Sequence, residues 1–126
     1  MNAEKLDKII KLFWKSKGNA DIFFLGRCAD VSWSIQKFLG EGDIYLVGGN
    51  GKDIVWHTIL KVGPDYFDIR GKQNLDEVLW HNPIALSTKA IVKAGPKEIQ
   101  HIISLLNNDF VSDTINGLKK AEQELK

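Results

Sequence analysis

Three side chains of this sequence could do chemistry together: a cysteine, a histidine and an aspartate. Cys28 is the only cysteine, and His57 and Asp68 follow it in that order. A thiol reacts as the thiolate, because the neutral SH group is a poor nucleophile. An imidazole can take the thiol proton and hold the thiolate as an ion pair, and a third polar group can fix the imidazole's tautomer and orientation. Cys28, His57 and Asp68 could fill these three roles.

The cysteine stands where a helix is expected to begin. Residues 28 to 39 carry an apolar stripe at helical spacing, and Gly40 is of the residue type that most often ends a helix. Unpaired N–H groups and the helix macrodipole favour an anion at a helix N-terminus, so this position lowers the pKa of a thiol. The sequence therefore predicts a helix that carries the nucleophile at its first turn.

The histidine and the aspartate are expected on two consecutive strands, residues 54 to 62 and residues 66 to 69. Between them, Gly63-Pro64-Asp65 predicts a turn with Pro64 at its i+1 position, because the proline ring presets the backbone angle needed there. Both strands are short and rich in apolar and aromatic residues. They are therefore expected to form an antiparallel pair.

The pairing of these strands decides whether His57 and Asp68 can meet. Counting across a tight turn at Gly63-Pro64-Asp65-Tyr66 pairs Lys61 with Asp68, and this places Asp68 on the same face of the sheet as His57. The same counting leaves the two residues several positions apart along the sheet. Strand twist, coiling or a bulge is needed to bring them together.

This order of residues resembles the NlpC/P60 branch of the papain-like cysteine hydrolases. That branch carries a helix-borne cysteine, a histidine opening a strand, a glycine-containing turn, an aromatic strand and a third polar residue. The likeness covers residues 24 to 71 and includes the run Trp56-His57-Thr58-Ile59-Leu60-Lys61-Val62-Gly63-Pro64-Asp65-Tyr66-Phe67-Asp68-Ile69. The resemblance implies a papain-like fold, with Cys28 as nucleophile, His57 as base and Asp68 as orienting residue.

The nucleophile segment departs from the family pattern. Arg27-Cys28-Ala29-Asp30 stands where the family usually has Asp-Cys-Ser-Gly. Stabilisation of an oxyanion would then rest on the Cys28 backbone N–H, together with Asn19 or another side chain. Trp56, beside His57, could wall a substrate groove. Asp30 would oppose a thiolate if it pointed towards the sulfur.

The rest of the chain is expected to complete an α+β fold, with the nucleophile helix packed on a small antiparallel sheet and helices at both ends. Glycines at 48, 49 and 51 indicate a hairpin loop. The other expected elements are helices over residues 3 to 16, 74 to 79, 96 to 107 and 110 to 124, and strands over residues 44 to 47 and 84 to 92. Residues 1 to 126 are expected to form a single papain-like domain.

Composition excludes several classes of function. The formal net charge is +1, so no global field points to nucleic acid or anionic lipid as a partner. A single cysteine excludes an internal disulfide framework and a Cys-rich zinc site within one chain, and we expect no metal and no cofactor. Acidic residues interrupt the first 17 positions, which therefore do not read as a signal peptide. We expect a cytoplasmic protein without a membrane span, unless a dedicated secretion system exports it.

The leading functional hypothesis is a thiol hydrolase acting on an amide, peptide or isopeptide bond of a peptide or protein, or a deamidase with the same machinery. Taken singly, Cys28 would more often be a small buried apolar residue, and His57 a strand residue bonded to a carbonyl. The alternative is a non-catalytic inhibitor or adaptor on the same fold that docks a partner protein through the C-terminal helices. Either function suits a phage or bacterial accessory protein or effector.

Overall fold

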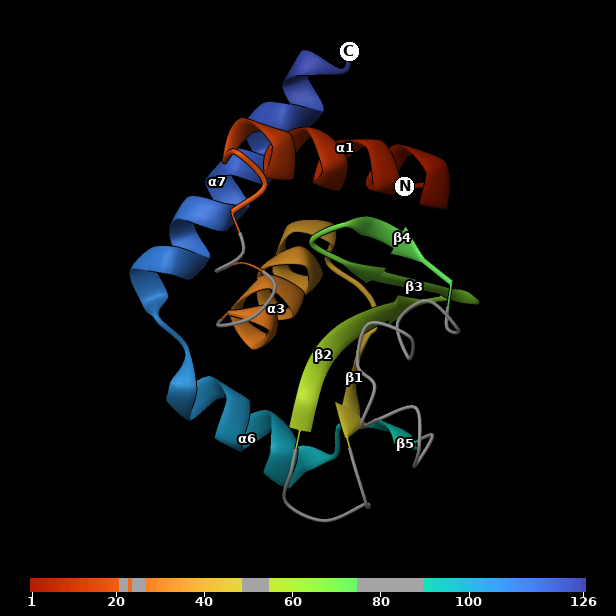
Figure 1. Ribbon diagram of the computed structural model, residues 1–126, viewed down its shortest axis with the longest axis vertical. Helices are drawn as coiled ribbons and strands as arrows, with labels where there is room; N and C mark the ends of the chain where they lie inside the picture. Colours follow the sequence, from red (N-terminus) through yellow and green to blue (C-terminus); the bar gives the residue numbers. More distant parts are fainter. Residues whose placement is uncertain (21–22, 24–26, 49–54, 75–89) are drawn as a thin grey trace.

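In the residues that the structure describes, four helices accompany a five-stranded sheet, so the architecture is α+β (Figure 1). The computed structural model describes residues 1–20, 23, 27–48, 55–74 and 90–126. In chain order the elements are α1 (Ala3–Ser16), α3 (Cys28–Leu39), β1 (Asp43–Gly48), β2 (Val55–Val62), β3 (Asp65–Asp68), β4 (Gly71–Gln73), β5 (Ala90–Lys93), α6 (Pro96–Leu105) and α7 (Asn108–Glu124).

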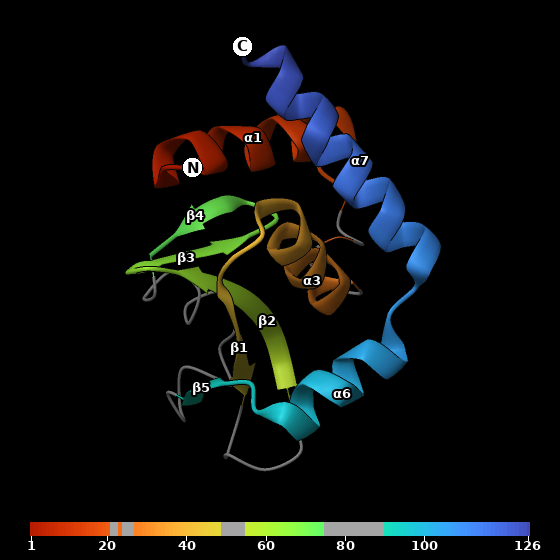
Figure 2. The ribbon, with the colours of Figure 1, turned by 180° about the vertical axis from the view of Figure 1, so that it is seen from behind.

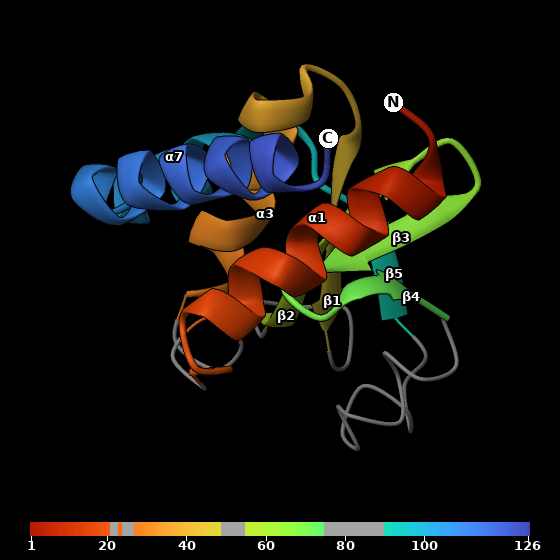
Figure 3. The same cartoon turned by 90° about the horizontal axis from the view of Figure 1, so that it is seen from above.

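The sheet has the strand order β4-β3-β2-β1-β5, and every neighbouring pair is antiparallel. Helix α3 lies between α7 and β2 and contacts both, as the view from behind shows (Figure 2). Helix α1 runs across the top of the molecule and contacts α7 and β4 (Figure 3). The main core lies among these elements and includes Leu6, Ile9, Ile10, Phe13, Val31, Ile35, Leu60, Phe67 and Leu118.

The helix that carries the cysteine has the bounds expected from its sequence. It begins at Cys28, ends at Leu39, and is followed by Gly40 in the left-handed conformation at φ 81°. Residues other than glycine rarely adopt this backbone angle. The N–H of Gly40 donates to the carbonyl of Gln36. The helix packs Val31 and Ile35 into the core, so its first residue is held at a defined place beside β2.

The register of β2 with β3 differs from the one counted on the sequence. Val62 pairs with Asp65, so the turn contains only Gly63 and Pro64, and Lys61 pairs with Tyr66 rather than with Asp68. Gly63, at φ 57°, takes the first central position and Pro64 the second, because a two-residue hairpin turn of this kind requires positive φ at its first residue. The shorter turn moves Asp68 two residues closer to His57. A shift of two leaves its facing unchanged.

A bulge adds to this approach. Val47 pairs with His57 and Gly48 with Val55, so β2 has one extra residue, Trp56, at this point. A bulge increases strand twist and redirects the neighbouring side chain. The need for a bulge or twist, inferred from counting, is therefore met directly beside His57.

The strand expected over residues 66 to 69 is β3, which spans Asp65–Asp68. It ends at Asp68, and Gly71 begins β4, which pairs back on β3 through a turn of Ile69 and Arg70. Gly71 has φ 97°, and a Cβ there would collide with the side chain of Asp7 on α1. Asp7 also accepts the backbone N–H of Lys72 at 2.6 Å. Close approach of α1 thus requires glycine and stabilises a strand that the sequence pattern did not indicate.

Several other expectations can be compared with the structure. Helix α1 has the expected bounds, α6 begins at Pro96 as expected, and α7 begins at Asn108, two residues earlier than expected. Strand β5 coincides with the end of the strand expected over residues 84 to 92. The glycine loop from residue 49 on and the helix expected from residue 75 on lie outside the described residues. No helix in the described part of the chain has both the length and the apolar character needed to cross a membrane.

Candidate active site

Cys28 occupies the first turn of α3, and the residue is partly exposed. The first turn of a helix leaves N–H groups without partners inside the helix. The preceding residue, Arg27, makes no side-chain capping bond to them, and the first intrahelical bond runs from the N–H of Val31 to the carbonyl of Arg27 at 2.9 Å. Cys28 therefore combines partial exposure with a place at the electropositive end of a helix.

The imidazole of His57 lies between the thiol and a carboxylate. Its Nε2 donates to Oδ2 of Asp68 at 3.2 Å. Hydrogen bonding and charge interaction with Cys28 are among the causes that raise the pKa of the ring. His57 and Asp68 are each only 2% exposed. The structure thus brings together the three residues proposed from the sequence, because His57 bonds Asp68 and the His57 ring and the Cys28 thiol each shift the pKa of the other.

Arg70, which sequence reasoning did not single out, forms several hydrogen bonds with the carboxylate of Asp68. Its Nη2 donates to Oδ2 at 2.7 Å, and its Nε lies 3.2 Å from Oδ2 and 3.3 Å from Oδ1. Its backbone N–H donates to Oδ1 at 2.8 Å. The signal in the sequence was Asp-Ile-Arg-Gly, since an aspartate often accepts the N–H two residues on when a turn follows.

Thr58 is the second residue that sequence reasoning missed. Hydrogen bonding by its backbone and by its side chain is among the causes that lower the pKa of the Cys28 thiol. The carbonyl of Thr58 accepts the hydroxyl of Ser32 at 3.0 Å, and this bond is buried. Cys28 and Ser32 are four residues apart and therefore share one face of α3. The bond from Ser32 therefore joins this face of α3 to β2 at Thr58, the residue next to His57.

These contacts shift three pKa values. Burial raises the pKa of the Cys28 thiol, but hydrogen bonds and charge interaction with His57, together with the two bonds from Thr58, outweigh burial and lower it overall. Burial lowers the pKa of His57, but Asp68 and Cys28 outweigh burial and raise it. Burial raises the pKa of Asp68, but His57 and Arg70 hold it below its usual range. All three shifts favour a thiolate, an imidazolium and a carboxylate side by side.

Asp30, which could have opposed the thiolate, is directed elsewhere. Its Oδ2 accepts the backbone N–H of Asn107 at 2.9 Å and lies 3.8 Å from Nη1 of Arg27. Asn107 is the N-cap of α7. Asp30 therefore links the start of α3 to the start of α7.

The two residues proposed for substrate contact have different outcomes. Asn19 lies in the turn that ends α1, at φ 53°, and its N–H donates to the carbonyl of Trp14 at 3.0 Å. Its side chain is exposed, and this position lends no support to a role in oxyanion stabilisation. The backbone of Trp56 belongs to β2, but its side chain lies outside the described residues, so its proposed contact with substrate stays a prediction.

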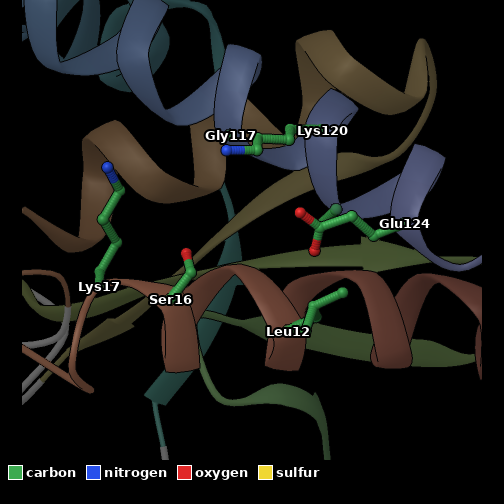
Figure 4. Close-up of a pocket in the computed structure, with 7 residues that line it drawn as sticks. Leu12, Ser16, Lys17, Gly117, Lys120 and Glu124 are labelled. Carbon is green, nitrogen blue, oxygen red and sulfur yellow. The ribbon is translucent and has the colours of Figure 1, made fainter.

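A hollow in the described part of the chain lies away from Cys28, His57 and Asp68. It has a volume of about 220 Å³ and lies between the end of α1 and α7 (Figure 4). Its lining residues are Leu12, Ser16, Lys17, Gly117, Lys120, Ala121 and Glu124. No cluster of metal-ligating side chains occurs among the residues with described positions. The candidate site is therefore defined by the thiol and its partners.

Comparison of the chain with protein-family models, with curated proteins and with solved structures gives no match. The chemical interpretation therefore rests on the geometry of Cys28 and its partners.

Proposed function

We propose that this protein is a thiol hydrolase with a papain-like fold that cleaves an amide, peptide or isopeptide bond in a peptide or protein, or a deamidase with the same machinery. One observation carries the proposal: a partly exposed cysteine at a helix N-terminus interacts with an imidazole whose Nε2 donates to a buried carboxylate, and this interaction lowers the pKa of the thiol. A buried structural cysteine needs no such set of partners.

The arrangement suits acyl transfer. The Cys28 thiolate attacks the substrate carbonyl, and N–H groups of the first turn of α3 stabilise the oxygen that gains negative charge. The His57 imidazolium gives its proton to the leaving amine, or to ammonia in a deamidation, as the carbon–nitrogen bond breaks. A water molecule, deprotonated by His57, then attacks the thioester, and cleavage of the carbon–sulfur bond releases the acid and restores the thiolate.

The resemblance to the NlpC/P60 branch supports the same roles. The features in common are the nucleophile on a helix, a histidine on the neighbouring antiparallel strand and a polar third residue. A cytoplasmic bacterial or phage protein, or an effector exported by a secretion system, fits this assignment as part of the proposal. Cell-wall peptide and protein side chains are both substrates of the required chemical class.

The first experiment measures alkylation of Cys28 by iodoacetamide as a function of pH, with mass spectrometry as readout. Because the pKa of the thiol is lowered and the pKa of His57 is raised, both groups are ionised at pH values between these two pKa values. Rapid labelling is therefore expected at pH 6 to 7, whereas an ordinary thiol, with a pKa of about 8.5, is labelled rapidly only at higher pH. His57→Gln should slow labelling at pH 6 roughly tenfold to a hundredfold, because most of the thiolate is lost.

The matched control is His101→Gln, which removes an exposed histidine of α6. It should leave the labelling profile unchanged. A wild-type profile with the midpoint of an ordinary thiol, unaffected by His57→Gln, would rule out the enzymatic proposal.

A second candidate function is a protein-binding module, and one observation favours it. Helix α6 buries only Ile102, whereas Ile103 and Leu105 are 48% and 61% exposed. Helix α7 is less suited to docking, because its apolar face already packs Val111, Leu118 and Ala121 inward. Under this alternative, Cys28→Ser keeps biological activity and Ile103→Asp with Leu105→Asp abolishes it. Under the enzymatic proposal the Cys28→Ser variant is inactive.

A further inference from the structure

The arginine behind the site has a geometry that a surface charge does not need. Arg70 is largely buried, with a side-chain exposure of 14%, and its Nε and Nη2 both hydrogen-bond with the carboxylate of Asp68. The turn of Ile69 and Arg70 between β3 and β4 brings the guanidinium back onto the residue that precedes the turn. The backbone N–H of Arg70 also donates to the carboxylate, at Oδ1. Backbone and side chain thus act on one carboxylate.

The two oxygens of Asp68 share one partner and differ in the others. Nε of Arg70 lies 3.3 Å from Oδ1 and 3.2 Å from Oδ2, and Oδ1 also receives the backbone N–H of Arg70. Oδ2 is shared by Nη2 of Arg70 at 2.7 Å and Nε2 of His57 at 3.2 Å. With Oδ1 held in the turn, the carboxylate cannot rotate without losing bonds, and Oδ2 stays directed at the imidazole. A rigid guanidinium fork provides this orientation where a lysine provides only a point charge.

Charge alternates along the whole chain of contacts. Arg70 is positive, Asp68 negative, His57 positive in the reactive state and Cys28 negative, so the four charges sum to zero in a largely buried site. Buried ions are tolerated when they are paired and hydrogen-bonded, and an unpaired buried carboxylate takes up a proton instead. Among the described residues, Asp68 without Arg70 would have His57 as its only charged partner.

We propose that Arg70 is a positioning residue of the thiol site, which holds the Asp68 carboxylate ionised and directed at His57, so that the thiolate–imidazolium pair persists into acidic solution. The inference rests on the proposed function, because it assigns a role in sustaining the reactive pair. Loss of Arg70 lets Asp68 take up a proton at higher pH. The imidazolium then loses its carboxylate partner, and the thiol is reprotonated at higher pH.

Other charged groups around this part of the sheet have partners of their own. From β2, the Lys61 ammonium lies over the rings of Tyr45 and Tyr66, 5.6 and 5.7 Å from their centres. From β4, Lys72 pairs with Asp65 at 3.3 Å. From α1, Asp7 pairs with Lys11 at 3.1 Å. The charge partners that lower the pKa of Asp68 are His57 and Arg70, and none of the groups named here is among them.

The test compares the acid limb of the Cys28 alkylation profile in wild type, Arg70→Gln, Arg70→Lys and Lys72→Gln. Arg70→Gln should move the midpoint of the acid limb up by about one pH unit, since a neighbouring arginine lowers a carboxyl pKa by one unit or more. Arg70→Lys should restore part of the shift, because it returns charge without the fork. Lys72→Gln, which removes an exposed cation two residues on, should leave the midpoint in place.

The outcomes separate this inference from the enzymatic proposal. A wild-type thiol with ordinary pH dependence overturns both. A depressed wild-type midpoint that Arg70→Gln leaves unchanged overturns the role of Arg70 alone, even if the variant is less stable, because a purely structural bond lowers stability without moving a midpoint. Carbon-13 titration of the Asp68 carboxyl in wild type provides a test that does not depend on folding of the variant. An Asp68 pKa at or above the ordinary value of about 3.9 overturns the inference.

Discussion

Two buried aspartates of this protein, Asp30 and Asp68, differ in what surrounds them. They are 4% and 2% exposed, and each lies near the reactive cysteine, Asp30 along the chain and Asp68 across the fold. Asp30 accepts a backbone N–H from the N-cap of α7. Asp68 accepts from the imidazole that contacts the thiol and from a guanidinium.

The difference teaches that distance from the cysteine in the sequence says little about chemical role. Asp30 comes two residues after Cys28, and two helical steps of about 100° each point it well away from the thiol. Asp68 lies on another element, and the register of a hairpin brings it to His57. Both carboxylates are buried, but their partners differ. Asp30 bonds the backbone of α7 and has a structural role, whereas Asp68 bonds the histidine that shifts the pKa of the thiol.

The largest expected effect is on stability. Asp68→Ala leaves a mostly buried guanidinium without its carboxylate, and loss of one partner of a buried ion pair typically costs about 3–5 kcal/mol in the free energy of unfolding. Asp30→Ala leaves one backbone N–H unsatisfied and should cost about 1–3 kcal/mol. Urea unfolding at pH 7 measures both values. Equal losses would remove the distinction between the two aspartates.

Reactivity should separate the two residues more cleanly than stability does. Asp68→Asn preserves shape but removes the charge that favours the imidazolium, so alkylation of Cys28 at pH 6 should fall about tenfold or more. Asp30→Asn should leave the rate within about twofold, because Asp30 is not among the groups that shift the pKa of the thiol. A large fall with Asp30→Asn would place that carboxylate in the site after all.

The smallest expected effects are those of Thr58 and Ser32, which again separate a residue that shifts the thiol pKa from one that contributes to stability. Thr58→Val removes the side-chain hydrogen bonding that helps to lower the pKa of the Cys28 thiol, so this pKa should rise and labelling at pH 6 should slow by several-fold. Ser32→Ala removes the bond to the Thr58 carbonyl and should cost about 1 kcal/mol of stability without moving the labelling midpoint. Labelling profiles and urea unfolding of both variants check this pair.

Sequence patterns were sufficient for the local elements around the cysteine. An apolar stripe and a following glycine predicted α3 from Cys28 to Leu39, and the stripe of Leu6, Ile9, Ile10 and Phe13 predicted α1 with its observed bounds. Such elements depend on spacing along one helix face, which is a property of consecutive residues. The order of cysteine, histidine and aspartate was also readable, and it pointed to the three side chains that meet.

By itself, then, the sequence determined which groups could react and which helix carries the thiol. Tertiary structure alone decided that they meet: a two-residue turn where four were counted, a bulge beside His57, and the return of β4 that brings Arg70 onto Asp68. The physical reason is that register and bulges are set by pairing between strands and by packing of α1 on Gly71, interactions between residues distant along the chain.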